Sequence, residues 1–181
     1  MAYTVEVIRS RRRSMALQVR PDGSVLVRAP LRTGTPAIRA FVARHGDWIE
    51  KQRLRIASAP PVEKLSEEEL SLLRRSASER FGERAAVFAP LVGVNYGRIT
   101  IRCQKSKWGS CSAAGNLNFN CLLMLAPPEV LDYVVVHELC HRLEMNHSDT
   151  FWRNVERVLP DWRERRKWLR EHGDALMARV R

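Results

Sequence analysis

The sequence predicts an α+β fold, and three observations support this prediction. Apolar and polar residues alternate near the N-terminus and again around residues 99–101, as they do in half-buried strands. Residues 66–88 and 129–143 instead show helical spacing and carry helix-start signals. A length of 181 residues with 45% apolar composition fits one domain, or one domain with an appended lobe.

Residues 1–60 are expected to form an N-terminal lobe rich in β-structure, a small antiparallel sheet followed by a first helix. The first strand lies in "YTVEVIRS", and two further β-rich runs flank Pro21-Asp22-Gly23. Proline presets φ and glycine allows a positive φ, so this tripeptide predicts a turn. Thr35 is a candidate helix cap because Pro36 follows at the first helical position.

Residues 61–181 are expected to form the second part of the chain. Ser66 and Glu69 form a capping box that opens a helix to about residue 88, with Pro90 beyond its end. A strand, a turn at residues 113–116 and a return strand over 116–125 follow. The next helix begins after Pro127 and Pro128. Pro160 separates two C-terminal helical segments, and Gly173 is a candidate C-cap.

The composition of the chain limits the cellular compartments and the kinds of partner that are expected. No secretory signal and no apolar stretch long enough to span a bilayer are visible, so a cytoplasmic protein without membrane contact is expected. The four cysteines lack a C-x-x-C pair and are expected to be free thiols. The net charge of +11 can attract nucleic acid, anionic lipid or acidic protein, although a genome rich in G and C, which favours arginine codons, also explains it.

The segment "VVVHELCHRLEMNHSDTFW" holds three of the five histidines of the chain. His137 and His141 stand four residues apart, so on a helix both side chains leave the same face and can hold one metal ion. Glu138 flanks them, as the carboxylate does in the H-E-x-x-H arrangement of metalloproteases. The pattern therefore predicts a metal site with an adjacent general base, and a buried helix with incidental histidines explains it less well.

A third ligand is expected from His147, which can reach the same ion only if the helix ends first. Asn146 is the expected hinge because asparagine tolerates the left-handed conformation, and Ser148 or Asp149 would cap the next helix. Three histidines leave one position of a tetrahedral site open, which is typical of catalytic zinc. One Zn²⁺ per chain is the predicted cofactor.

This site predicts hydrolysis of peptide bonds in a peptide or protein substrate. Glu138 would accept a proton from a metal-activated water and pass it to the leaving amine. The developing oxyanion needs a further electrophile. Four residues are chemically suitable, and no spacing selects among them: Tyr96, Lys107, Asn120 and His172.

"KSKWGSCSAAGNLNFN" followed by "VLDYVVVHELCHRLEMNHSDTFW" resembles the YgjP-like, SprT-related family of zinc metallopeptidases. The resemblance implies a small gluzincin-like zincin core, with an antiparallel sheet and an active-site helix, carrying an N-terminal β-rich lobe. It assigns zinc binding to the three histidines and general base catalysis to Glu138. It also implies that an edge strand pairs with the substrate, and places Leu117, Asn118 and Phe119 in that strand. The chain departs from the family pattern at Cys121 and Leu122, where tryptophan and arginine are usual.

Alternatives remain open at the level of sequence. The chain can be a DNA-associated zinc protein, either a protease on DNA-bound proteins or a basic nucleic-acid-binding module. A zinc scaffold without turnover is a weaker alternative, because Glu138 is intact. Trp108 either packs against the active-site helix or joins a basic, aromatic patch. The basic run near the C-terminus is either a solvated helix face or an anion-binding surface: Arg163, Arg165, Arg166, Lys167 and Arg170.

Overall fold

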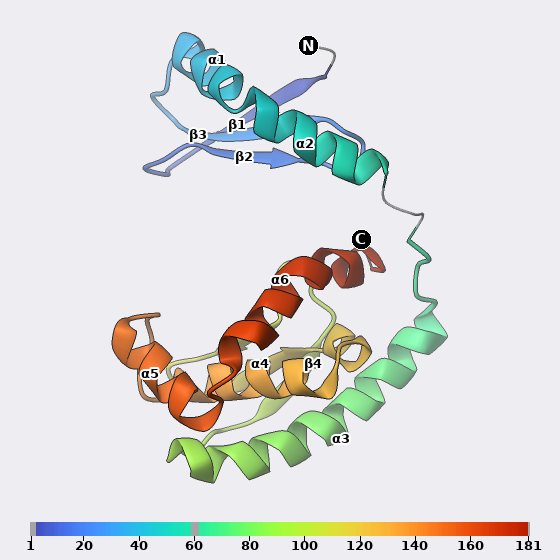
Figure 1. The fold of residues 1–181 in the computed structure, drawn as a ribbon, viewed down its shortest axis with the longest axis vertical. Coiled ribbons are helices and arrows are strands. Elements are labelled where there is room, and N and C mark those ends of the chain that lie inside the picture. The colour runs from blue at the N-terminus through green and yellow to red at the C-terminus, as the bar shows by residue number, and fades with distance from the viewer. Residues whose placement is uncertain (1–2, 59–61, 181) are drawn as a thin grey trace. The chain divides into compact units, whose positions relative to one another are not determined.

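A computed structural model describes residues 3–58 and 62–180, and the chain divides into two compact units, residues 1–61 and 62–181 (Figure 1). Each unit combines helices with a small three-stranded sheet, so the predicted α+β class is confirmed. Within the described residues, no helix is both long enough and apolar enough to cross a membrane. The predicted linker around residues 59–61 lies outside the described residues.

The first unit is built on strands β1 (Val5–Ser10), β2 (Ala16–Val19) and β3 (Val25–Pro30). The predicted turn joins β2 to β3, with Gly23 at φ 79° and the Asp22 side chain accepting from the Ser24 amide at 2.9 Å. The sheet order is β1-β3-β2, with β1 parallel to β3, so the expectation of an entirely antiparallel sheet is wrong. Strand β3 takes the centre because it carries the most deeply buried apolar side chains.

Two helices, α1 (Thr35–Arg44) and α2 (Gly46–Ala57), complete the first unit. Gly34 rather than Thr35 is the N-cap of α1, with Pro36 in its first turn. His45 lies between the helices, and its Nδ1 is 2.8 Å from the Phe41 carbonyl oxygen. The apolar core of the unit lies between these helices and β3, and includes Ile38 and Ile49.

The second unit opens with α3 (Glu67–Val92), which begins at the predicted capping box. The Ser66 hydroxyl accepts from the Glu69 amide, and the Glu69 carboxylate accepts from the Ser66 amide. The predicted stop at residue 88 is too early, because Pro90 lies inside the last turn. The helix ends at Val92, and its C-cap is Gly93, which has φ 85°. Pro90 removes one amide donor from the last turn, and the burial of Val92 against the core keeps that turn in the helix.

Strands β4 (Ile99–Arg102), β5 (Gly109–Cys111) and β6 (Leu117–Asn120) form the second sheet in the order β4-β6-β5. This sheet is also mixed rather than antiparallel, since β4 runs parallel to β6. The return strand is shorter than predicted, because a 3-10 helix, η1 (Cys121–Leu125), replaces its second half. The Asn120 side chain starts that turn by accepting from the Leu122 amide at 3.2 Å.

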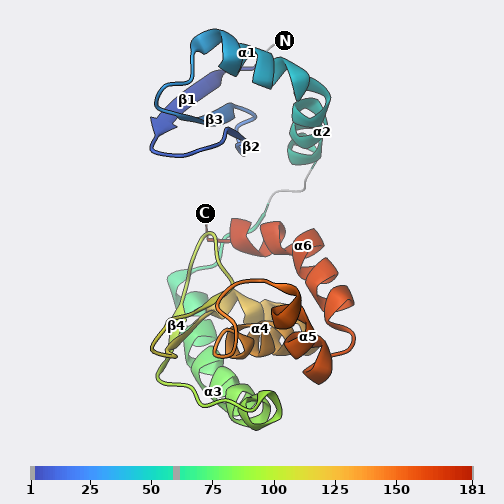
Figure 2. The same ribbon diagram turned by 90° about the vertical axis from the view of Figure 1, so that its left-hand side faces the viewer.

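Helix α4 (Pro128–Cys140) is the central element of the second unit (Figures 1 and 2). Helix α3, α5 (Asp149–Val158) and α6 (Trp162–Ala178) all pack against it, and so does β5. Nine of its residues are buried, as expected for a helix enclosed by others. Gly173 is not a C-cap but lies within α6, where a Cβ atom would approach Trp108 Cζ2 to 2.9 Å.

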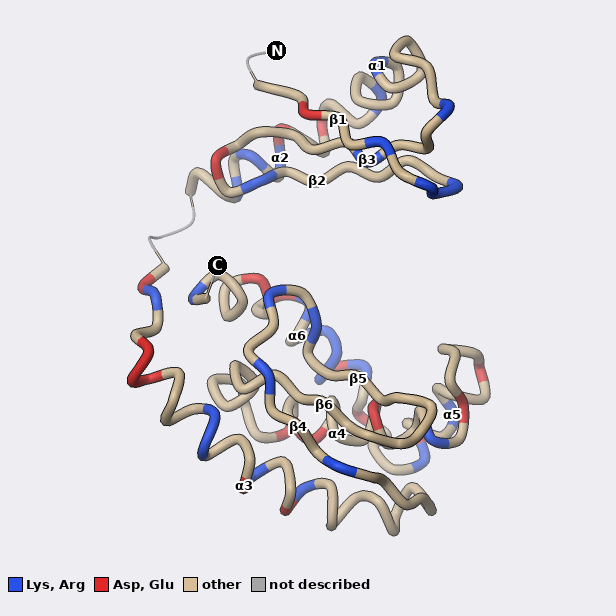
Figure 3. Tube along the Cα trace, turned by 180° about the vertical axis from the view of Figure 1, so that it is seen from behind, with Lys and Arg blue, Asp and Glu red and all other residues tan. Residues whose placement is uncertain are grey.

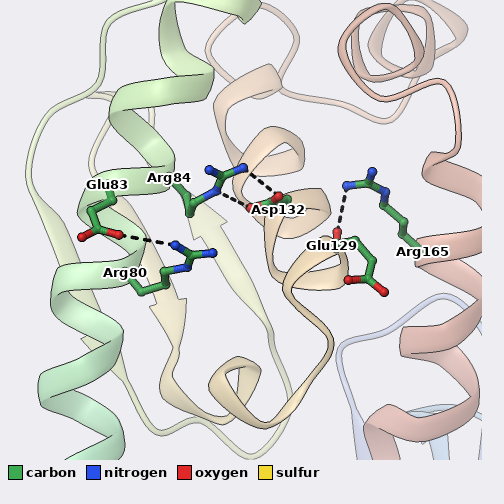
Figure 4. Close-up of polar contacts among 6 residues, drawn as sticks. All are labelled: Arg80, Glu83, Arg84, Glu129, Asp132 and Arg165. Atoms are coloured by element: carbon green, nitrogen blue, oxygen red, sulfur yellow. Dashed lines mark hydrogen bonds and ion pairs between the residues drawn. The ribbon is translucent and has the colours of Figure 1, made fainter.

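Arginines of two neighbouring helices fix the position of α4 (Figure 4). Arg84 of α3 binds both carboxylate oxygens of Asp132, at 2.6 and 2.8 Å. Arg165 of α6 donates to the carbonyl oxygen of Glu129 at 3.0 Å, in the first turn of α4. The helix that carries His137 and Glu138 is therefore tied to the rest of the unit by polar contacts as well as by packing.

Candidate active site

The structure brings together the three histidines that the sequence predicts as metal ligands. Their ring centroids are 4.8 to 4.9 Å apart, and one candidate ligand nitrogen from each ring lies within 4.8 Å of the others. His137 Nε2 and His147 Nε2 are only 3.0 Å apart. Such a cluster is a donor set that could hold a metal ion.

The chain reverses between His141 and His147 by a different route from the predicted one. Helix α4 ends at Cys140, and His141 is its C-cap. Among the described residues, none except glycine has a positive φ, so the left-handed conformation predicted for Asn146 is wrong. The Asn146 side chain instead accepts from the Ser148 amide at 2.9 Å, an Asx turn that gives the reversal without backbone strain. Ser148 then caps α5, as predicted.

Burial favours the neutral, metal-binding form of His137 and His147. Burial, with smaller contributions from His141, His147 and Arg166, lowers the pKa of His137 to about 3. Burial, with smaller contributions from His141 and Arg166, lowers the pKa of His147 as well. The Glu144 carbonyl oxygen lies 3.0 Å from His141 Nδ1 and can accept a hydrogen bond from an N–H there, a tautomer in which the lone pair is at Nε2. Neutral imidazoles are the form that binds metals.

Phe151 is a site residue that the sequence reasoning missed. Its fully buried ring touches all three imidazoles, with centroid distances of 4.9, 4.6 and 4.8 Å to His137, His141 and His147. It lies three residues beyond the Ser148 cap, in the first turn of α5. Spacing from the N-cap could have indicated an inward-facing aromatic residue here, but not that it would contact the histidines.

Glu138 is buried, with 5% of its surface exposed, and faces strand β5. A Cβ atom at Gly109 would come within 2.6 Å of Glu138 Oε1, so only glycine leaves room for this carboxylate. Burial raises the pKa of Glu138 to about 8, while the nearby Lys107 lowers it. The carboxylate is thus held in a low-dielectric position where a neighbouring positive charge would favour ionisation.

The strand that flanks the site is β5, not the predicted one. The expectation that Leu117, Asn118 and Phe119 form an edge strand is wrong, because β6 pairs with β4 on one side and β5 on the other. Both neighbours use its backbone groups, and Leu117 and Phe119 are core residues. Strand β5 is one of the two edge strands of this sheet, and it lies against α4.

The open side of β5 presents backbone groups from two residues. The Asn120 amide donates to the Trp108 carbonyl, and the Ser112 amide donates to the Asn116 carbonyl. Hydrogen-bonded pairs alternate along an antiparallel ladder, so the backbone groups of Gly109 and Cys111 face away from β6. Arg142 stabilises the adjoining turn by donating to the carbonyl oxygens of Asn95 and Ala113.

A cleft of about 370 Å³ adjoins the histidine cluster, between the loop before β5 and helices α4 and α6. Among the four predicted electrophiles, only Lys107 lines it. Asn120 is buried and donates to the carbonyl oxygens of Gln104 and Lys107, so its role is structural. His172 stacks on Trp168 and is not part of the lining.

Tyr133 was not foreseen as a site residue, yet it also lines the cleft one helical turn before His137. Burial raises the pKa of Tyr133 to about 12, so its hydroxyl group stays protonated and can donate. Trp108 is partly buried and packs against α6 at Gly173 while lining the same cleft, so it is not part of an exposed patch.

A known protein family matches most of this chain. The YgjP-like metallopeptidase domain family matches residues 13–73 and 61–172. A solved structure, the metallopeptidase zymogen abylysin of Pyrococcus abyssi, is similar with a TM-score of 0.46 and 22% identity, over 50% of this chain and 93% of that chain. The comparison with curated proteins gave no match. Because the family covers most of the chain, from the first unit through the histidine cluster, this protein belongs to the YgjP-like metallopeptidase family.

Proposed function

We propose that this protein is a zinc-dependent peptidase that hydrolyses peptide bonds with Glu138 as general base. The observation that carries the proposal is the convergence of three imidazoles beside a buried carboxylate. Burying an unpaired carboxylate is costly, and a structural role would be served better by an apolar residue. Such a cost is expected where a carboxylate has chemistry to perform.

His137, His141 and His147 would hold the metal, and their all-nitrogen donor set fits Zn²⁺. Zinc, when bound, would act as a Lewis acid that lowers the pKa of a bound water and polarises the substrate carbonyl group. A dication beside Glu138 would also lower the pKa of its carboxyl group from about 8, which makes the ionised base available near neutral pH.

The residues of the chain have separate tasks in this proposal. Glu138 accepts a proton from the attacking water and returns it to the leaving amine. The open backbone groups of Gly109 and Cys111 pair with an extended substrate by strand addition to β5. Lys107 and Tyr133 line the cleft and are the candidates for stabilising negative charge on the carbonyl oxygen.

The test is the Glu138→Gln variant, compared with Glu129→Gln as a matched control on the exposed start of the same helix. Removal of a general base typically lowers the rate by about 10²–10⁴-fold. We expect E138Q to lose hydrolysis of unstructured protein while its zinc content stays near one per chain, and E129Q to match the wild type. Full activity of E138Q would overturn the proposed mechanism.

A second candidate function, contact with nucleic acid, is favoured by the uneven distribution of charge. Residues 1–61 hold 12 of the 31 Lys and Arg residues but only 4 of the 20 Asp and Glu residues, so they carry +8 of the total +11 (Figure 3). Arg11 and Arg13, between β1 and β2, and Arg32, after β3, are exposed. A concentrated positive charge of this kind attracts phosphate backbones.

This second candidate is tested by titrating single- and double-stranded DNA at two salt concentrations. Binding through phosphates must weaken steeply as salt rises. We expect a variant with Arg11, Arg13 and Arg32 replaced by Gln to bind more weakly and with a shallower salt dependence. Arg75→Gln, an exposed change in the second unit, serves as the control. No measurable binding at low salt would remove this function.

A further inference from the structure

The cleft beside Glu138 has an apolar floor and a positively charged rim. Trp108, Val134 and Leu169 supply apolar surface at its base, while Lys107, Arg166 and Arg170 line it with exposed side chains. His137 and Glu138 form part of the same lining. A group bound in this cleft would therefore lie directly next to the site at which the peptide bond is proposed to be cleaved.

The basic residues of α6 differ in how their charges are used. Arg163 pairs with Glu156, and Arg165 pairs with Asp161 at 2.9 Å. Arg166 and Arg170 form no ion pair within residues 3–58 and 62–180, and neither does Lys107. The sequence left open whether this run is a solvated face or an anion-binding surface. The structure separates it into arginines that are neutralised and arginines that line a cleft.

Aromatic rings hold Arg166 in place. Its guanidinium carbon lies 4.8 Å from the centroid of Trp152 and 5.9 Å from that of Trp162, and the two indoles are stacked at 4.4 Å. Stacking uses the face of the guanidinium and leaves its N–H edge free to donate. A planar edge with parallel donors matches the two oxygens of a carboxylate.

We propose that this cleft binds a carboxylate of the substrate, either an acidic side chain or the free C-terminus, beside the bond that is cleaved. The proposal rests on the proposed peptidase function. Glu138 is the only carboxylate among the lining residues, and it is assigned to catalysis. The cations at the rim can therefore pair with a carboxylate of the substrate. The apolar floor would contact the methylene groups that lead to the carboxylate.

Peptide binding to zinc-loaded Glu138→Gln tests the proposal without turnover. One peptide carries an internal Glu and an amidated C-terminus, a second carries Gln there and a free C-terminus, and a third carries Gln and an amide. Charge-assisted hydrogen bonds give about 10-fold tighter binding for one or both of the first two. The pair of results shows whether the carboxylate comes from a side chain or from the chain end.

Adding Arg166→Gln or Arg170→Gln is expected to reduce the 10-fold preference to about 1 while affinity for the uncharged peptide is retained. Lys167→Gln removes a charge from the same helix outside the cleft and should keep the preference. Arg166→Lys should restore part of it, which a merely structural role would not do. Equal affinity for all three peptides, no measurable binding of any, or an equal loss in K167Q would overturn the inference.

This outcome is independent of the test of the proposed function. If wild type hydrolyses peptides and shows no carboxylate preference, only the cleft assignment fails. If the zinc-loaded protein binds carboxylate peptides preferentially but wild type cleaves none of them, the assignment of the cleft stands and the catalytic proposal fails.

Discussion

The two units of the molecule differ in what they bury. In the described part of the first unit every buried side chain is apolar, whereas the second unit buries Asn120, Glu138 and His141 as well. Burying polar groups costs free energy unless they are hydrogen-bonded; Asn120 and His141 have hydrogen-bond partners, and Glu138 is buried beside the histidine cluster. The first unit thus has an apolar core with its charges at the surface. The second unit also holds polar side chains in fixed positions inside its core.

The largest expected effect that distinguishes the units is that of zinc. At a concentration 1,000 times its dissociation constant, a ligand stabilises the protein that binds it by about 4 kcal/mol. We expect zinc to slow amide hydrogen exchange in the second unit and to leave the first unchanged. His141→Ala should lower zinc affinity by at least the roughly 100-fold seen when an outer partner of a ligand is lost. His45→Ala in the first unit is the control, and equal protection of both units would contradict the assignment.

The next effect concerns the ion pair that holds α4. Asp132→Asn leaves Arg84 without its bidentate partner in a partly buried position, with side-chain exposures of 24% and 14% in the wild type. Loss of a partly buried charged pair costs about 3 kcal/mol, which denaturant unfolding followed by tryptophan fluorescence would detect.

Figure 4 also shows the control, Glu83, which pairs with Arg80 at 3.4 Å on α3, the helix that carries Arg84. These side chains are 41% and 65% exposed, and Glu83→Gln should change stability by less than about 1 kcal/mol. Equal losses of stability in Asp132→Asn and Glu83→Gln would show that burial does not explain how much the Arg84–Asp132 pair stabilises the protein.

The sequence predicted best what local chemistry decides. The Ser66 capping box, the Gly23 turn and the H-E-x-x-H helix depend on neighbouring residues, and the structure contains each of them. The sequence did not predict that β6 is the central strand. The order of strands depends on which strand buries the most apolar surface, and that is a property of the whole sheet. Phe151 was missed for the same reason: its contacts with the three imidazoles form only when α5 folds back on α4.

A smaller effect is expected from pH on the metal-free protein. The carboxyl pKa of Glu138 is about 8 in the folded state, above its ordinary value of 4.5, so the folded state holds that proton more tightly and stability falls as pH rises towards 8. The pKa of His137 is about 3, below its ordinary value of 6.5, so the stability that this histidine contributes is lost as pH falls from 6.5 to 3. The two slopes oppose each other between pH 4.5 and 6.5, and the slope due to Glu138 continues above pH 6.5.

We therefore expect the EDTA-treated protein to lose about 2 kcal/mol of stability between pH 6.5 and 8, measured by urea unfolding at each pH. Glu138→Gln removes the titrating group and should abolish this decline, with the effect confined to the second unit. A decline of the same size in E138Q would place its origin in another group.

The smallest effect is predicted for an ion pair of the first unit. Arg20 and Glu6 meet at 2.6 Å, the same distance as Arg84 and Asp132, but their side chains are 33% and 47% exposed. Water competes for both partners and salt screens them, so a short distance at the surface adds little stability. We expect Glu6→Gln to leave the unfolding midpoint unchanged. A loss of stability as large as that expected for Asp132→Asn would mean that the first unit also depends on precise polar contacts. The two units would then not differ in how much polar contacts contribute to their stability.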